Sequence, residues 1–443
     1  MLRVPAGPQL AQCGNASASF KLDFMTVKSD QIMSMTSASF LHRNVRLAAV
    51  FTIGTWIACW AAYLLLPFSF PLKAHNGIIA IMLALTTFTI WPALRAMPSR
   101  AYHKSGPSRR ARGVPLIVLV GLPATLFLWV DLYLIRGLSL TGEIGINRTQ
   151  FINSSPSIAG YLSYISCAAL LLTLSALPMF SRRLRILVLM VYASAAALLL
   201  ISGNRQFVTA GLLITYLSYL ICSTTPRTRK LIVGFFGAAA FATLALIIQF
   251  SRQSFADGEQ LEFLVGISKI ECHGLLCTTP AVVPAMYLYQ YYGTVFIGAS
   301  FYILQDIHTP AMSTTFPIIY KRISGIFGLP SHQEVVSQAL ARVESHAGVF
   351  PNFWKTMYGH LYSDYGWIGI FVWVIVYRAL LARAVCRIMN DLSMDRVATV
   401  TVLLAFVIIG VMFTPTTEPI FTVALIMIYA RIAWSRIGFM NGR

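Results

Sequence analysis

Charged side chains are scarce in this chain of 443 residues. Asp, Glu, Lys and Arg together make up 11% of it, whereas hydrophobic residues make up 57%. A soluble domain carries about 25% charged residues because its exterior faces water. With less than half of that share, most of the surface of this protein must face lipid. The composition therefore argues against a soluble enzyme or a DNA-binding module.

Acidic residues are scarcer still than basic ones. The 15 Asp and Glu stand against 34 Lys and Arg, which gives a formal net charge of +19. Such an excess can indicate nucleic-acid binding, but the basic residues lie in short clusters between long apolar runs and form no single stripe with interleaved aromatics. This placement is typical of membrane topology signals, so we expect no nucleic-acid partner.

Long apolar runs dominate the sequence, and a run of about 20 residues crosses the hydrocarbon core of a bilayer as a helix. The ten runs cover 46–69, 77–97, 114–135, 157–180, 185–202, 206–223, 231–250, 362–386, 397–414 and 419–435. We therefore expect an all-α polytopic membrane protein. Its parts would be a disordered cytoplasmic head (1–45), seven helices (46–250), one large loop (251–361), three helices (362–435) and a cytoplasmic tail (436–443).

The distribution of Lys and Arg predicts the orientation, because cytoplasmic loops near span ends are enriched in them. With the N-terminus inside, 24 of these residues lie inside and 10 outside. Both termini are then cytoplasmic and the large loop is extracytoplasmic. Residues 1–44 lack the features of a cleavable signal peptide, so the first span would act as its own insertion signal. No fixed-period repeat is evident, which argues weakly against transporters built from duplicated halves.

Two of the seven cysteines, Cys272 and Cys277, lie in the predicted outer loop, in Glu-Cys-His-Gly-Leu-Leu-Cys. An oxidising compartment would allow a disulfide between them. Two free thiols and a Cys-His-Cys zinc site are the alternatives, although no fourth ligand is visible for a metal. The sequence leaves these three interpretations open.

Asp131 is the only carboxylate well within a predicted span. A charge in hydrocarbon is costly, so Asp131 should face the bundle interior or a wet cavity. It would serve either as a helix-to-helix hydrogen-bond partner or in a substrate or proton role. Four arginines, Arg136, Arg148, Arg205 and Arg252, follow spans on the predicted outer face. A guanidinium binds phosphate through two parallel hydrogen bonds, but it can also simply snorkel to ordinary lipid headgroups.

The large loop mixes aromatic residues with seven acids, and an eighth, Asp364, follows just after it. Its apolar stretch 285–298 is rich in Tyr, which suits the headgroup interface, and we expect an interfacial or re-entrant helix there that caps a cavity. The segment 352–369 combines aromatics with Asn, His and Asp. Aromatics stack on sugar faces while the polar groups bind hydroxyls, so this composition suits carbohydrate, and it equally suits an interfacial aromatic belt.

Four short motifs follow one another along the chain: Ser-Gly-Asn-Arg-Gln (202–206), Tyr-Gln-Tyr-Tyr-Gly (289–293), Ser-Thr-Thr-Phe-Pro (313–317) and the segment 352–369 with its Tyr-x-Asp-Tyr-Gly-x-x-Gly ending. With the hydropathy plan, they resemble the O-antigen polymerases (Wzy) and related oligosaccharide repeat unit polymerases of bacterial envelopes. The family tends to place Thr three positions after the Asn. Here Lys355 stands in that place and Thr356 is four positions away.

The resemblance implies a metal-independent glycosyltransferase of the GT-C type in the bacterial inner membrane, with no cofactor. It would polymerise oligosaccharide units carried on undecaprenyl diphosphate, at the periplasmic face, into O-antigen or exopolysaccharide. An O-antigen ligase and a lipid-linked oligosaccharide flippase are the alternatives. Membrane lipids, a chain-length regulator and a flippase are the further candidate partners.

The same resemblance assigns roles to individual residues. Cations would hold the diphosphate leaving group, a base would serve the acceptor hydroxyl, and aromatic and amide groups would bind sugar. The candidates are Arg148, Arg205 and Arg252 for the diphosphate, Asp364, His360 and His346 for the base, and Tyr291, Tyr292, Asn352 and Tyr362 for the substrate.

Overall fold

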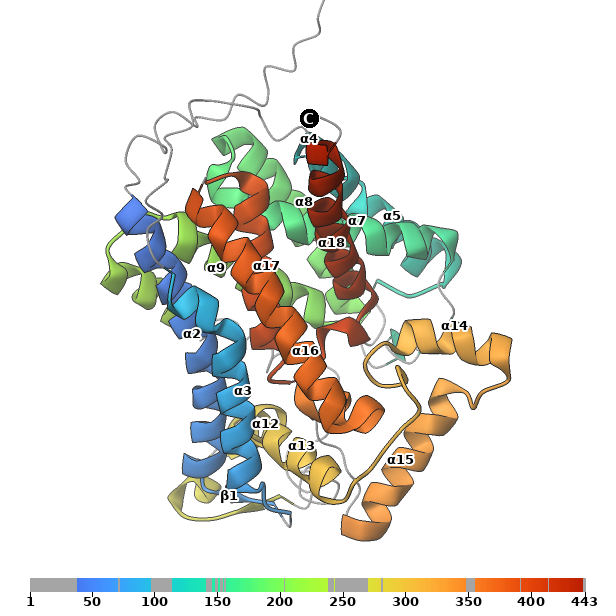
Figure 1. Ribbon diagram of the computed structural model, residues 1–443. Coiled ribbons are helices and arrows are strands. Elements are labelled where there is room, and N and C mark those ends of the chain that lie inside the picture. The colour runs from blue at the N-terminus through green and yellow to red at the C-terminus, as the bar shows by residue number, and fades with distance from the viewer. Residues whose placement is uncertain are drawn as a thin grey trace, which may run out of the picture.

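The computed structural model describes residues 38–70, 72–96, 114–140, 146–147, 150–151, 154, 157–202, 204–237, 243, 270–279, 282–347, 355–390, 392–412 and 414–440. Over these residues the chain is mostly helical, with one pair of two-residue strands (Figure 1). The bundle contains α2 (Ala38–Leu65), α3 (Asn76–Leu94), α4 (Val114–Gly121), α5 (Ala124–Trp129), α7 (Ile158–Leu174), α8 (Arg182–Ile201), α9 (Gln206–Cys222), α16 (Met357–Asn390), α17 (Met394–Ile409) and α18 (Pro419–Met440).

Five of the described helical segments are long and apolar enough to cross a membrane: Phe40–Leu65, Asn76–Leu94, Ile117–Ile135, Arg182–Ile201 and Met357–Asn390. Ile158–Leu174, Gln206–Cys222, Val295–Leu304 and Pro419–Ala430 are apolar but shorter. Large apolar side chains also stand on the outside of the bundle, for example Ile368, Ile375 and Leu64. An apolar exterior of this kind is compatible with an α-helical membrane protein.

Several predicted spans correspond to helices whose ends lie a few residues from the predicted ends. Two predicted spans differ more strongly from the structure. The third run is interrupted at Pro123, and it consists of α4, α5 and the π-helical turn η2 (Val130–Ile135). The first helix begins at Ala38, inside the predicted head, while residues 1–37 lie outside the described part. The seventh run, 231–250, lies largely outside it as well.

Local sequence explains where several helices begin. Ser157 and Ser181 are the N-cap residues of α7 and α8, and each side chain accepts a hydrogen bond from a backbone N–H of the first turn. Ser331 and Glu334 form a reciprocal capping box before α15 (His332–Ala347), because the Ser331 N–H donates to Glu334 Oε2 at 2.7 Å and the Glu334 N–H donates to Ser331 Oγ at 3.2 Å.

The described part of the predicted outer loop folds into short elements at the end of the bundle away from the C-terminus of α18 (Figure 1). Strand β1 (Phe68–Ser69), which follows α2, pairs antiparallel with β2 (Glu271–Cys272). The chain continues through η4 (Leu275–Thr278), α12 (Val282–Leu288), the π-helical turn η5 (Tyr289–Gly293), α13 (Val295–Leu304), α14 (Pro317–Phe327) and α15.

Of the three interpretations left open for Cys272 and Cys277, the structure has the disulfide. Cys272 and Cys277 are bonded, with their Cα atoms 5.8 Å apart. The bond closes the turn after β2, where the His273 N–H donates to Pro67 O at 2.8 Å. This turn therefore fastens the loop to the end of α2.

The Tyr-rich stretch 285–298 is a broken helix rather than one continuous span. All residues from Val295 to Ile303 in α13 are buried. Trp56 of α2 and Tyr358 of α16 pack in the same apolar cluster as Phe296. The segment thus packs inside the helical bundle, while its expected interfacial or re-entrant placement in the membrane stays a prediction. It places α13 directly beside the first turn of α16.

Candidate active site

The side chain of Asp364 lies at the centre of a polar cluster between α16 and the loop before α14. Its carboxylate is 7% exposed and accepts hydrogen bonds from residues of the loop 309–315. Oδ1 accepts from Thr309 Oγ1 at 2.8 Å, from Ser313 Oγ at 3.3 Å and from Thr314 Oγ1 at 2.8 Å. Oδ2 accepts from the N–H and the Oγ1 of Thr315, at 2.8 and 2.7 Å, and the Thr314 N–H reaches both oxygens.

These hydrogen bonds determine what Asp364 can do. A carboxylate that accepts several hydrogen bonds, two of them from adjacent backbone N–H groups, is held in one orientation. Its lone pairs are already directed at loop donors. Asp364 is therefore suited to ordering the loop 309–315 and poorly placed to accept a proton from a substrate hydroxyl.

The backbone around the cluster is strained at two points. Met312 has φ 69°, a left-handed conformation uncommon for a residue with a side chain, and Gly366 has φ 63° and ψ −160°, which only glycine adopts readily. Gly366 breaks α16 just after Asp364. The first part of the helix therefore belongs to the polar cluster, and the second part carries the exposed apolar residues.

Lys355 stands immediately before α16, next to this cluster. Its side chain is half-buried, and Nζ lies 3.8 Å from the centre of the Tyr302 ring and donates to Ser363 Oγ at 3.1 Å. Burial lowers the pKa of Lys355 from 10.5 to about 7, although the charge of Asp364 opposes the shift. An amine with such a pKa is present in both its charged and its neutral form near pH 7.

Two histidines approach the cluster. His360 lies on the first turn of α16, half-buried, and the Thr314 hydroxyl is 3.2 Å from its backbone carbonyl. His332 begins α15, and burial is the main cause that lowers its pKa. Nδ1 of each imidazole is buried and has no hydrogen-bond partner among the described residues. Each could accept a proton.

A second group of side chains adjoins the cluster through α16, in which Asp306 and His308 are exposed and Tyr362 is buried. Tyr362 donates to Asp306 Oδ1 at 2.5 Å, and His308 Nε2 lies 3.0 Å from the same oxygen. The His308 ring stacks on Tyr362, with centroids 5.2 Å apart, and Trp367 meets Tyr362 edge to face. The hydrogen bond from Tyr362 and the neighbouring His308 lower the pKa of Asp306. Flat rings beside a carboxylate suit the binding of a sugar.

The structure thus brings together three of the predicted site residues: Asp364, His360 and Tyr362. Tyr292 is half-buried and packs against the apolar cluster around α13, so it lies within the fold of the loop. Arg205 is half-buried just before α9. His346 and Tyr291 lie in α15 and η5, but their side chains lie outside the description, as do Arg148, Arg252 and Asn352 entirely.

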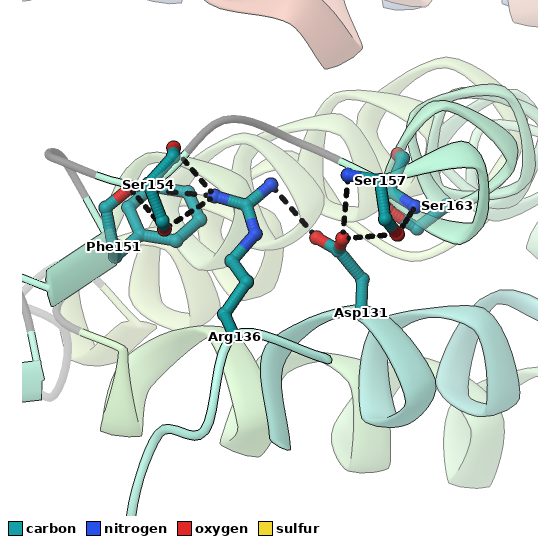
Figure 2. A network of polar contacts seen from close by, with 7 residues as sticks. Asp131, Arg136, Phe151, Ser154, Ser157 and Ser163 are labelled. Carbon is teal, nitrogen blue, oxygen red and sulfur yellow. Dashed lines mark hydrogen bonds and ion pairs between the residues drawn. The ribbon is translucent and has the colours of Figure 1, made fainter. Parts of the chain in front are cut away.

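Asp131 and Arg136 form a separate buried network (Figure 2). Arg136 Nη2 lies 2.8 Å from Asp131 Oδ2, and both side chains are almost completely buried. Asp131 Oδ1 also accepts from the Ser157 N–H at 3.0 Å and from Ser157 Oγ at 2.6 Å. Arg136 Nη1 donates to the carbonyls of Phe151 and Ser154, each at 3.3 Å. The helix-to-helix interpretation of Asp131 is therefore the one that its contacts favour.

This network also changes the interpretation of Arg136, which the sequence groups with the outer arginines. Its guanidinium faces Asp131 and backbone carbonyls, so it does not extend to lipid headgroups. The close approach of α7 depends on Gly160, because a Cβ there would lie 2.7 Å from both Asp131 oxygens. Arg136 and Asp131 thus join η2 to the start of α7.

Several residues of the cluster were not predicted from the sequence. In the sequence, Lys355 stands out only as a departure from the family motif, and no pattern singles out Thr309, Asp306 or His308. A lysine between two aromatic-rich segments at the start of an apolar run is the one signal that points to Lys355. The chain matches no family model, no curated protein and no solved structure.

Proposed function

We propose that this chain is a membrane glycosyltransferase that polymerises oligosaccharide units carried on undecaprenyl diphosphate. The main support is the contact between the Ser313–Pro317 segment and the Tyr362–Gly366 segment, two motifs on which the resemblance rests. They lie about 50 residues apart in sequence, and Asp364 joins them through the Thr314 and Thr315 donors. Two motifs that converge on one buried carboxylate are expected of a site and not of an aromatic belt.

The finer architecture belongs to the same proposal. The charge distribution favours ten spans with both termini in the cytoplasm and the large loop at the periplasmic face of the bacterial inner membrane. In this orientation the cluster around Asp364 faces the periplasm, where the lipid-linked units would be presented. A GT-C-like arrangement, with a polar site at the outer end of a helical bundle, is the fold class that fits this plan.

In the proposed reaction, a hydroxyl at the non-reducing end of the acceptor unit attacks the anomeric carbon of the growing chain. The bond between that carbon and the diphosphate oxygen breaks, and the electron pair leaves with undecaprenyl diphosphate. Of the two base candidates whose side chains are described, His360 fits the role better than Asp364, because its Nδ1 has no hydrogen-bond partner among the described residues and both Asp364 oxygens accept from the loop. The exposed His308 ring and the half-buried Trp367 ring would contact the sugar, and the buried Tyr362 ring, which touches both, would hold them in place.

The experiment that tests this function is deletion of the gene in its host, followed by analysis of lipopolysaccharide and exopolysaccharide. Single repeat units on the lipid carrier would support a polymerase. Complete but unattached chains would instead indicate a ligase, and units trapped in the cytoplasm a flippase. Complementation with wild-type protein should restore long chains.

Variants at matched protein level sharpen the test. His360→Gln should abolish chain elongation, since glutamine cannot take the proton. His75→Asn is the matched control, because His75 lies exposed before α3 and makes no cap with its side chain. Normal polymer from His360→Gln would remove His360 from the mechanism, and a normal polysaccharide profile in the deletion strain would refute the proposed function.

A further inference from the structure

The ammonium group of Lys355 carries a charge that the described residues do not neutralise. Its Nζ donates to one neutral hydroxyl, Ser363 Oγ, and lies over the Tyr302 ring. Among the residues that the structure describes, no carboxylate lies within 4.0 Å of it. A half-buried cation without an anionic partner is unfavourable, so the free amine gives up its proton readily, and a bound anion would hold it in the charged form.

Asp364 is the carboxylate whose charge acts on Lys355. Its two oxygens accept hydrogen bonds from the backbone and hydroxyl donors of Thr314 and Thr315, so the carboxylate is not free to turn. The charge of Asp364 favours the protonated amine, but too weakly to offset the burial of Lys355. Among the described residues only Ser363 accepts a hydrogen bond from the ammonium group, so further N–H donors remain for a ligand.

We propose that Lys355 binds the diphosphate of the lipid-linked donor substrate and stabilises the negative charge that develops on the leaving oxygen. This inference rests on the proposed function, and it assigns a role to a residue that the family motif does not contain. The ammonium group lies over the Tyr302 ring and donates a hydrogen bond to Ser363. Its position is therefore set before the substrate binds.

The proposed reaction also needs a base. The acceptor oxygen forms a bond to the anomeric carbon, the carbon–oxygen bond to the diphosphate breaks with its electron pair, and the hydroxyl proton moves to the base, for which His360 is the candidate. Lys355 keeps its proton throughout, because the anion beside it favours the charged amine. At a pH above 7 the free site must first take up a proton at Lys355, so diphosphate affinity should fall as pH rises.

Binding can be measured directly on full-length protein in nanodiscs of phosphatidylcholine, which carry no net charge. Farnesyl diphosphate and inorganic pyrophosphate are the two probes, titrated at pH 6.5 and 8.5. The titratable groups that face Lys355 are Tyr302 of α13 and His360 and Asp364 of α16. Because the probes themselves titrate over this range, Lys355→Arg provides the reference: its charge does not change between the two pH values.

We expect Lys355→Met to weaken diphosphate binding tenfold or more, and wild-type affinity to fall by about tenfold more than that of Lys355→Arg between pH 6.5 and 8.5. Lys73→Met, at an exposed position before α3, should bind as wild type. Binding of farnesyl diphosphate but not of pyrophosphate would show that the lipid tail is needed, and equal binding of both probes would show that the diphosphate suffices. Either result supports the proposal if the Lys355→Met variant loses that binding.

Unchanged binding in Lys355→Met would overturn the inference. That failure is distinct from failure of the proposed function, because the binding measurement requires no polymer. If the protein elongates polysaccharide but binds diphosphate equally well without Lys355, the proposed function stands and the proposed role of Lys355 fails. If it binds diphosphate through Lys355 but its deletion leaves the host polysaccharide normal, the role of Lys355 in binding stands and the proposed function fails.

Discussion

Asp131 and Arg136 form an ion pair inside the helical bundle, with 2.8 Å between the carboxylate and the guanidinium and almost no exposure of either side chain. The pair joins the π-helical end of the third predicted span to the N-terminus of α7, since Asp131 also accepts from Ser157. A buried pair of this kind specifies one arrangement of helices more than it adds stability.

Removal of one partner should therefore be worse than removal of both. Arg136→Met leaves the Asp131 carboxylate uncompensated and should lower the free energy of unfolding by about 3 to 5 kcal/mol. The double variant Asp131→Leu with Arg136→Met should lie much closer to wild type. Unfolding of the purified proteins in identical nanodiscs measures both values. Equal losses in the single and double variants would contradict a coupled pair.

Asp364→Asn should release the loop 309–315. An amide has one acceptor oxygen where the carboxylate has two. Either the N–H and hydroxyl of Thr315 or the hydroxyls of Thr309, Ser313 and Thr314 therefore lose their acceptor, and each buried donor left without one costs about 1 to 3 kcal/mol. Hydrogen exchange of the Thr314 and Thr315 amides should accelerate, while amides of α7 stay protected. Unchanged exchange in the loop would show that Asp364 does not hold it.

Reduction of the Cys272–Cys277 bond should loosen the turn after β2. A disulfide limits the conformational entropy of the unfolded chain, and one that closes a loop of this size stabilises the folded protein by about 2 kcal/mol. Melting in the presence and absence of reductant measures the loss, and alkylation followed by mass spectrometry verifies that both thiols are released. The variant with Ser at both positions should melt like the reduced protein and should be insensitive to reductant.

Gly366→Ala should distort the break in α16. The nearest atom to an added Cβ is His308 Cε1 at 3.6 Å, so space is available, but φ 63° with ψ −160° is strained for alanine by about 1 to 3 kcal/mol. Gly325→Ala, in α14, is the control, because a Cβ there has nothing within 4 Å and the backbone is helical. A variant at 366 as stable as the one at 325 would exclude strain at this position.

Lys355→Met should raise the melting temperature, most strongly at acidic pH. The pKa of Lys355 is lowered from 10.5 to about 7 in the folded protein, so the unfolded chain binds more protons between these values. The penalty on folding is complete below pH 7 and disappears as pH approaches 10.5. The stabilisation by Met should follow the same course across a pH series, and a gain independent of pH would point to packing alone.

Hydropathy predicted the positions of several helices well, because long apolar runs bounded by Ser, Arg or Gly leave little choice of ends. The run 206–223 became Gln206–Cys222, and the run 185–202 became Arg182–Ile201. The start of α2 was missed. Arg43 and Arg46 interrupt the apolar run there, yet Leu41, Val45 and Ala48 recur at helical spacing and are buried on one face.

The candidate site was only partly predictable. Sequence patterns identified Asp364 and His360 because they stand in a conspicuous aromatic motif. They could not reveal that the loop 309–315 wraps around Asp364, since contacts between residues about 50 positions apart leave no periodic signal. Lys355 became visible only when its distances to Tyr302 and Ser363 were known.

The polar cluster depends on segments that are synthesised late. Thr416 Oγ1 donates to the Thr315 carbonyl at 2.5 Å, and the Met357 N–H donates to the Gly410 carbonyl at 2.8 Å. The turn between α17 and α18 therefore holds the loop around Asp364 and the start of α16 in place through these hydrogen bonds. A chain that ends before residue 416 would therefore lack these contacts even with every upstream helix in place. The cluster around Asp364 is thus complete only once the last part of the sequence has been made.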